Sequence, residues 1–263
     1  MEAAFFDLDK TVIARASIVA FGRPFYEGGL ISRGAMVRAL ASQFVYLFLG
    51  ASEEKVDKIR ESVLLLTRGW DHLEVSRIVR ETLDRVVEPI IYAEALDLIE
   101  QHHAAGRRVY LVSASPEEIV TPLAEYLGAD GSVASRAVVD DEGRYTGEMA
   151  FYAYGPFKAE AIQSLAERDD LDLSGSFAYS DSYTDTPMLE TVGHPVVVNA
   201  DRVLARLARQ RGWESARFSR PVRLRDRVPA PSLPRAAAFT AIAITATGTA
   251  VMGWRYGHRL GRT

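Results

Sequence analysis

The chain of 263 residues contains no cysteine. Disulfide bonds, thiolate metal sites and cysteine nucleophiles are therefore excluded, and the absence fits a reducing compartment. Lysine is also scarce, because the basic residues are nearly all arginines and the lysines are only Lys10, Lys55, Lys58 and Lys158. If the protein uses a catalytic lysine, it has few candidates.

Charge of either sign shows no large excess. The formal net charge is −4, with 48% hydrophobic and 25% charged residues, as in an ordinary globular protein. This balance argues against a nucleic-acid partner, since domains that bind nucleic acids are usually basic. The first residues carry no basic stretch and no long apolar run, so a secretory signal is not expected. We therefore expect a cytoplasmic catalytic domain.

Strands and helices alternate over much of the chain. Residues 3–6 form a short apolar run that predicts a buried strand, and similar runs at 108–113, 177–180 and 196–199 are separated by helical segments. This alternation predicts an α/β fold with a doubly wound parallel sheet. Asp140-Asp141-Glu142-Gly143 lies between two further β-rich runs and predicts a hairpin.

A helical block interrupts this alternation after the first strand. Ser32 and Ser52 each precede a helical segment, and Asp71 with Glu74 forms a capping-box pattern before a third. Such a block inserted into an α/β core predicts a small cap. The predicted division is a catalytic core over 1–14 and 90–212 and a helical cap domain over 15–89.

The C-terminal part differs in composition. Residues 213–235 are rich in arginine and proline and predict a linker, and 236–263 form a hydrophobic C-terminal segment. Its stretch 236–254 is about one membrane thickness long if helical. Its threonines and glycines make its hydrophobicity borderline, so a membrane anchor, a docked helix and an unstructured tail are all open. As an anchor, it would hold the catalytic domain at the inner face of the membrane, because arginine-rich segments stay on the cytoplasmic side.

Polar clusters follow the predicted strands or open the predicted helices. They are Asp7-Leu8-Asp9-Lys10-Thr11, Ser113-Ala114, Lys158 and Ser180-Asp181-Ser182-Tyr183-Thr184-Asp185. The carboxyl ends of parallel strands share one edge of a sheet, where ligands bind, so we expect these clusters to meet there. Ser115 precedes Pro116 and Glu117, a pattern that predicts a helix-capping serine.

This ordered set resembles the haloacid dehalogenase superfamily, in the phosphoserine-phosphatase-like branch with a helical cap (subfamily IB). The family pattern is Asp-x-Asp-x-Thr, a Ser or Thr, a Lys, and Gly/Ser-Asp-x-x-x-Asp. All four parts occur in order over about residues 1–212. The resemblance implies a Rossmann-like core and a phosphoric monoester hydrolase with an aspartyl-phosphate intermediate.

The residue types suit that chemistry. A carboxylate is ionised at neutral pH and can attack phosphorus, and neighbouring carboxylates raise the pKa of a second one that must act as an acid. Several aspartates would repel a phosphate dianion, so the site needs positive charge. The resemblance implies Asp7 as nucleophile, Asp9 as general acid and base, Ser113, Ala114 and Lys158 as phosphate ligands, Thr11 and Asp185 as supporting residues, and Mg²⁺ held by Asp7, Asp9 and Asp181.

The resemblance also bears on the substrate. Phosphoserine phosphatases of this branch carry a glutamate soon after the first motif that binds the amino group of phosphoserine, whereas the matching stretch 13–17 has no acidic residue. Arginines of the predicted cap could bind a negative or polar group instead; they are Arg33, Arg38, Arg60 and Arg68. We therefore expect a substrate other than phosphoserine, such as a glycerol- or lipid-derived phosphate. The alternatives are a phosphoryl transferase or mutase on the same site, and a non-catalytic membrane-tethered binding module.

Overall fold

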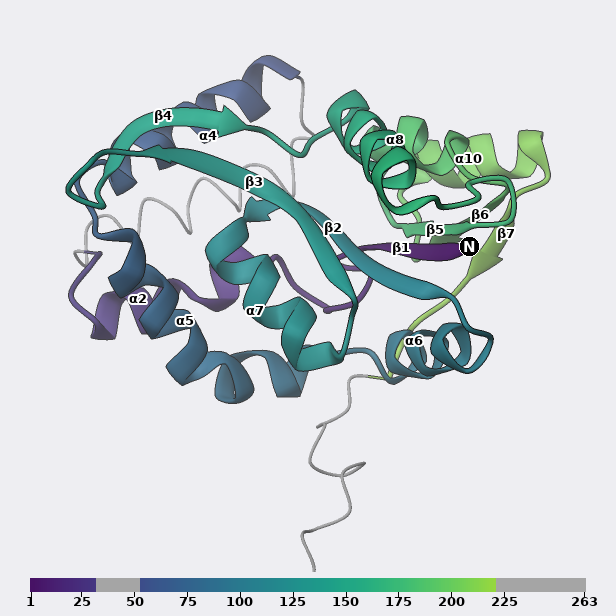
Figure 1. Ribbon diagram of the computed structural model, residues 1–263, viewed down its shortest axis with the longest axis horizontal. Helices are drawn as coiled ribbons and strands as arrows, with labels where there is room; N and C mark the ends of the chain where they lie inside the picture. The colour runs from purple at the N-terminus through teal and green to yellow at the C-terminus, as the bar shows by residue number, and fades with distance from the viewer. Residues whose placement is uncertain (32–52, 221–263) are drawn as a thin grey trace, which may run out of the picture. The chain divides into compact units, whose positions relative to one another are not determined.

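A seven-stranded sheet organises the computed structural model, which describes residues 1–31 and 53–220 (Figure 1). The strand order is β4-β3-β2-β1-β5-β6-β7, and every neighbouring pair is parallel except β3 and β4. The strands are β1 Ala3–Asp7, β2 Arg108–Pro116, β3 Gly131–Val139, β4 Tyr145–Phe151, β5 Phe177–Ser180, β6 His194–Val198 and β7 Glu214–Ala216. The predicted α/β class with a doubly wound sheet is confirmed, and so is the hairpin around residues 140–143.

Helices cover both faces of the sheet. They are α6 Ala93–Ala104, α7 Glu117–Leu127, α8 Pro156–Asp169, α9 Thr186–Glu190 and α10 Arg202–Arg211. Phe5 belongs to a buried cluster with Ile162 of α8, Met188 of α9 and Leu204 of α10. Phe6 points to the opposite face, as strand alternation requires, and lies against His102 of α6. Burial on both faces explains why β1 is continuously apolar up to Asp7.

Between β1 and α6 the described residues form mainly helices. These are α1 Ser17–Ala20, α2 Gly22–Glu27, α4 Glu53–Thr67, α5 His72–Val87 and the 3₁₀ turn η1 Glu88–Ile90. Asp71 caps α5 as predicted, since its Oδ1 accepts from the backbone N–H groups of Leu73 (2.8 Å) and Glu74 (3.3 Å). The helix predicted from Ser32 to Leu49 lies outside the described residues.

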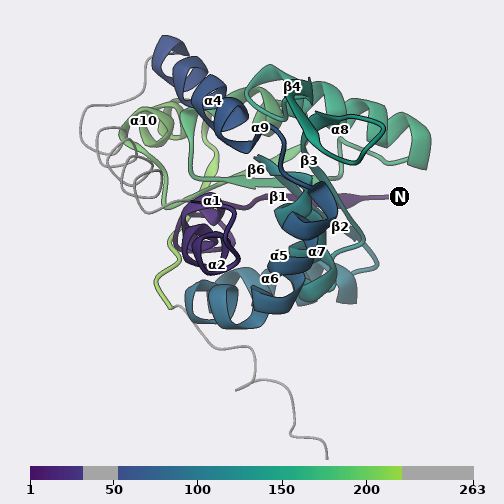
Figure 2. The same ribbon diagram turned by 90° about the vertical axis from the view of Figure 1, so that its left-hand side faces the viewer.

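The turn between α4 and α5 is attached to the β3–β4 hairpin. Gly69 N donates to Tyr145 O (2.8 Å), Tyr145 N donates to Trp70 O (3.0 Å), and His72 N donates to Gly143 O (3.1 Å). Helix α5 packs against α7 and also against α2, which lies beside it in Figure 2. The inserted helices are thus tied to the sheet, and the boundary of the cap at 15–89 stays a prediction.

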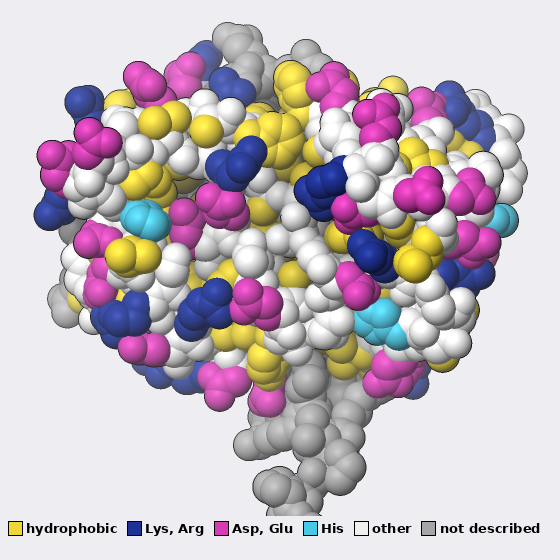
Figure 3. Space-filling view, viewed as in Figure 1, with side chains coloured by type: hydrophobic (Ala, Val, Ile, Leu, Met, Phe, Trp, Pro, Cys, Tyr) yellow, Lys and Arg dark blue, Asp and Glu magenta, His cyan; other side chains and the backbone are white. Residues whose placement is uncertain are grey.

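The sheet extends beyond the predicted end of the core at residue 212. Strand β7 pairs with β6, and the Asn199 side chain bonds both the N–H (3.1 Å) and the carbonyl (3.0 Å) of Phe218. The predicted linker over 213–235 therefore contains an ordered strand near its start. Its part beyond residue 220 and the segment 236–254 lie outside the described residues. No helix in the described part of the chain is long and apolar enough to cross a membrane. The face in Figure 3 mixes acidic and basic side chains, in keeping with the small net charge.

His102 lies buried near the C-terminal end of α6. This position in the sequence predicts a solvated side chain, but only 4% of it is exposed. Its Nε2 lies 2.8 Å from the Tyr179 hydroxyl, and burial lowers its pKa to about 4. Its neighbour His103 is the exposed one, with Nε2 3.1 Å from Asp130.

Candidate active site

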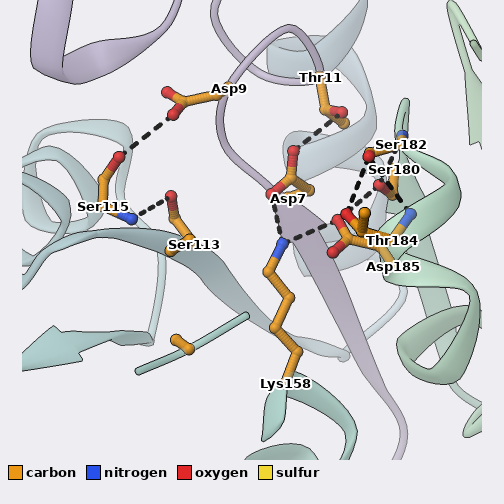
Figure 4. A network of polar contacts seen from close by, with 12 residues as sticks. Asp7, Asp9, Thr11, Ser113, Ser115, Lys158, Ser180, Ser182, Thr184 and Asp185 are labelled. Carbon is orange, nitrogen blue, oxygen red and sulfur yellow. Dashed lines mark hydrogen bonds and ion pairs between the residues drawn. The ribbon is translucent and has the colours of Figure 1, made fainter. Parts of the chain in front are cut away.

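The loop after β1 separates the two leading carboxylates. Val12 N (2.9 Å) and Ile13 N (3.1 Å) both donate to Leu8 O and close the loop. Lys10 adopts φ 64°, a left-handed conformation that is uncommon outside glycine. In Figure 4 the Asp7 side chain points toward Lys158 and the Asp9 side chain points toward Ser115. One tight turn thus directs two neighbouring carboxylates to different partners.

Lys158 is the buried cation of the site. Its Nζ donates to Asp7 Oδ1 at 2.7 Å and to Asp185 Oδ2 at 2.8 Å. Lysines in the first turn of a helix are usually solvated, but this side chain is only 3% exposed. Asp185 Oδ2 also accepts from Ser180 Oγ at 2.7 Å. Ser180 belongs to the polar cluster that was expected at the site, but the sequence assigned it no role of its own; it lies at the end of β5, directly before Asp181.

The electrostatics of this cluster favour a second cation. Burial raises the pKa of Asp7 well above its ordinary value, Lys158 opposes the rise, and the nearby charges of Asp185 and Asp181 add to it. Burial likewise raises the pKa of Asp181 to about 7, with Lys10 opposing. Against the effect of its own burial, Asp185 and Asp7 raise the pKa of Lys158. More carboxylates than ammonium groups are therefore buried together.

The donor chemistry fits Mg²⁺. Asp7 and Asp181 come from the carboxyl ends of the neighbouring strands β1 and β5, and carboxylate oxygens are the ligands that Mg²⁺ prefers. Within residues 1–31 and 53–220, no donor bonds the Asp181 carboxylate, and no three His, Asp or Glu side chains converge as a metal site. Two carboxylates would therefore need the Asp9 main-chain carbonyl and water to complete the shell, an arrangement common for Mg²⁺.

Ser113 and Ala114 lie at the end of β2, where its pairing with β3 becomes irregular. Ser113 Oγ accepts from Ser115 N at 3.1 Å, which leaves its hydroxyl proton available to a phosphate oxygen. The Ala114 carbonyl accepts from Ser135 Oγ at 2.7 Å, which fixes that peptide. Both predicted phosphate ligands thus share the sheet edge that carries Asp7.

Asp9 is held by two serines, Ser17 and Ser115, which the sequence patterns did not connect with it. Its Oδ1 accepts from Ser17 N at 2.7 Å and its Oδ2 accepts from Ser115 Oγ at 3.1 Å. Burial raises the pKa of Asp9. The prediction that Ser115 caps α7 is wrong, because β2 runs on to Pro116, which occupies the cap position without a side-chain bond. Thr11 donates to Asp7 Oδ2 at 3.4 Å and so supports Asp7 rather than Asp9.

Comparison with known proteins agrees with this geometry. The family described as haloacid dehalogenase-like hydrolase matches residues 4–190. A protein of Streptomyces azureus named inhibition of morphological differentiation protein is 52% identical over 251 residues, which cover 95% of this chain and 91% of the relative. A probable phosphatase of Mycobacterium tuberculosis is 50% identical over 244 residues, which cover 93% of this chain and 85% of the relative.

A solved structure has the same fold. A phospho-aspartyl intermediate analogue of phosphoserine phosphatase superposes with a TM-score of 0.59 at 19% identity, covering 86% of this chain and 96% of that chain. The two proteins therefore share a fold, as the predicted Rossmann-like core requires.

Proposed function

Because the chain belongs to the haloacid dehalogenase-like hydrolase family, we propose that it hydrolyses a small phosphate monoester through a phospho-aspartate on Asp7, with Mg²⁺ bound. The coarser assignment, a phosphoric monoester hydrolase, follows from the family and from the relative named a probable phosphatase. The observation that carries the mechanism is the buried contact of Lys158 with Asp7 and Asp185. Asp9 follows Asp7 by two residues and is held separately by Ser17 and Ser115.

In the first step the Asp7 carboxylate attacks phosphorus. A bond forms between an Asp7 oxygen and phosphorus, the ester P–O bond breaks, and the leaving oxygen takes a proton from Asp9. Lys158 orients Asp7 and offsets the negative charge that gathers around the phosphoryl group. Ser113 and Ala114 bind phosphoryl oxygens at the end of β2. A raised pKa suits Asp9 to this role, because the acid form must be present at neutral pH.

In the second step Asp9 acts as the base. It takes a proton from a water molecule that attacks phosphorus, the bond to Asp7 breaks, and inorganic phosphate leaves. Mg²⁺, held by Asp7, the Asp9 carbonyl and Asp181, would supply the charge stabilisation that lets a dianionic ester approach these carboxylates. Asp185 supports the site by holding Lys158.

The test is phosphate release from an aryl phosphate by the wild type and by Asp7→Asn, in Mg²⁺ and in EDTA. We expect release only from the wild type with Mg²⁺. Equal activity of Asp7→Asn would show that Asp7 is not the nucleophile, and full activity in EDTA would exclude the metal. Product analysis separates hydrolysis from the alternative on the same site, since a mutase yields an isomeric phosphate ester and no free phosphate.

For the substrate we propose a phosphate ester other than phosphoserine, derived from glycerol or a lipid. The support is that the stretch 13–17 offers no carboxylate for an amino group and that Arg15, its one charged side chain, is basic and exposed. A panel of phosphoserine, glycerol phosphate and lysophosphatidate tests this by their kcat/KM values. Phosphoserine turnover equal to that of the other two would remove the basis of the proposal.

A membrane anchor at 236–254 stays a prediction that goes with this substrate class. Fractionation of cells that produce the full chain, compared with a chain ending at Arg220, tests it. If the full chain is recovered with the inner membrane and the shortened chain is not, the result supports an anchored catalytic domain. Equal recovery of both chains in the cytoplasmic fraction contradicts it.

A further inference from the structure

Two buried serine hydroxyls lie beside the carboxyl group of Asp9. Ser115 Oγ lies 3.1 Å from Asp9 Oδ2, the contact drawn in Figure 4. Ser17 Oγ lies 2.7 Å from Ser115 Oγ, and Ser17 N lies 2.7 Å from Asp9 Oδ1. Ser17 is fully buried and Ser115 is 7% exposed. Both carboxyl oxygens of Asp9 therefore accept hydrogen bonds from residues outside the Asp-x-Asp-x-Thr motif that contains it.

The two oxygens of Asp9 have different partners. Oδ1 faces a backbone N–H, which can only donate, so this oxygen cannot also carry a proton toward that partner. Oδ2 faces a hydroxyl, which can donate to a carboxylate and can accept from a carboxylic acid. The Ser115 contact therefore gives Oδ2 a partner that can serve both protonation states of Asp9.

Ser115 also links the acid to the phosphate-binding residues. Its backbone N–H donates to Ser113 Oγ at 3.1 Å, while its side chain contacts Asp9. The segment at the end of β2 therefore fixes both a predicted phosphate ligand and the direction of the acid. Ser17 begins α1, so the same contacts reach the first of the inserted helices.

We propose that Ser115 is a positioning residue for Asp9, with Ser17 supporting it, and that the pair sets the oxygen from which Asp9 delivers its proton. This inference rests on the proposed phosphatase function and goes beyond it. When the ester P–O bond breaks, its electron pair stays on the leaving oxygen, and that oxygen takes the proton from Asp9 Oδ2. The Asp9 carboxylate that results accepts the Ser115 hydroxyl proton as a hydrogen bond.

The leaving group makes this testable. An alkoxide is a poor leaving group and needs the proton from Asp9, whereas a nitrophenolate is a stable anion and leaves without it. We therefore expect Ser115→Ala to lower kcat/KM about tenfold or more on glycerol phosphate and less than about threefold on nitrophenyl phosphate, as loss of acid catalysis predicts. Ser115→Thr, which keeps the hydroxyl, should restore most of the activity on glycerol phosphate.

A second comparison separates positioning from a general structural effect. In an Asp9→Asn background, Ser115→Ala should cause no further loss on glycerol phosphate, because it acts through Asp9. Ser176→Ala is the matched control, since Ser176 is a buried serine whose Oγ accepts from Ala3 N (2.9 Å) at the far end of β1. It should leave the ratio of the two kcat/KM values unchanged.

The outcomes are distinct. Equal losses on both esters, no loss on either, or a further loss in the Asp9→Asn background would overturn the role of Ser115. A wild type that releases phosphate from neither ester would instead contradict the proposed function itself.

Discussion

The Lys158 ammonium lies 2.7 Å from the Asp7 carboxylate, and the two side chains are only 3% and 8% exposed. A buried ion pair costs desolvation energy that its own attraction barely offsets, and removing one member leaves a charge without compensation. Lys158 also contacts Asp185. Stability and proposed chemistry at this edge of the sheet therefore depend on the same cation.

Lys158→Gln should lower both the activity and the stability of the protein. Removal of the ammonium leaves Asp7 and Asp185 facing one another, so we expect a loss of roughly 3 kcal/mol in the free energy of unfolding. The rate of phosphate release should fall by about 100-fold or more, because a group that stabilises transferred charge is lost. Urea unfolding and steady-state kinetics measure the two effects. Lys58→Gln, at an exposed lysine, is the control, and full activity of Lys158→Gln would refute the assigned role.

Asp181→Asn should weaken the binding of Mg²⁺ without disturbing the fold. One of the two side-chain ligands is neutralised, so the Mg²⁺ concentration for half-maximal activity should rise about tenfold or more, at least as much as for loss of an outer-shell partner. Burial raises the pKa of Asp181 to about 7, so its ionisation disfavours the folded metal-free protein increasingly as pH rises toward that value.

The same variant should therefore unfold at a higher temperature than the wild type in EDTA at pH 8, with the difference shrinking toward pH 4. Asp141→Asn, at an exposed aspartate in the hairpin turn, should change neither property. An unchanged Mg²⁺ requirement in Asp181→Asn would exclude Asp181 as a ligand.

The sequence patterns predicted the sheet, and they predicted which polar residues meet at its edge, because both depend on local signals. Buried parallel strands are continuously apolar, and the polar residues that follow them mark their carboxyl ends. Ser115 shows where this reasoning fails. Ser-Pro-Glu-Glu is a strong local cap pattern, but the bond from Ser115 to Asp9 joins residues 106 positions apart and keeps the serine in β2.

His102 and β7 were missed for related reasons. The end of a helix is usually solvated, but Phe6 and Tyr179 from two strands surround His102, and no pattern within α6 reveals them. Strand β7 reads Glu-Ser-Ala and has no apolar alternation; it forms because β6 offers it an open edge. Contacts between distant segments, rather than local propensity, decide these positions.

The cap of α5 gives a prediction for the inserted helices. Asp71→Ala removes the acceptor for the backbone N–H groups of Leu73 and Glu74, so the free energy of unfolding should fall by about 1 kcal/mol. Asp84→Ala, at an exposed aspartate inside the same helix, should have a smaller effect. Urea unfolding with an unchanged m-value measures both. Equal effects of the two substitutions would show that the cap does not contribute.

The buried imidazole of His102 should make stability depend on pH. Burial, with the nearby charges of Arg107 and His103, lowers its pKa from 6.5 to about 4. Between these values the unfolded chain binds a proton at this position and the folded protein does not, so the free energy of unfolding falls as pH falls through this window. Above pH 6.5 both states are neutral at His102 and this contribution to the pH dependence vanishes.

His102→Gln should remove that dependence while keeping a hydrogen-bonding side chain beside the Tyr179 hydroxyl. Urea unfolding gives the free energy of unfolding of each protein at both pH values. The value for the wild type minus the value for His102→Gln should fall by roughly 2 kcal/mol from pH 7.5 to pH 5, since each pKa unit is worth about 1.4 kcal/mol. The comparison with a variant cancels the carboxylates that titrate in the same range. His103→Gln, at the exposed neighbour, should follow the wild type at both pH values. If the difference between wild type and His102→Gln is the same at both, the buried histidine is not the group that titrates.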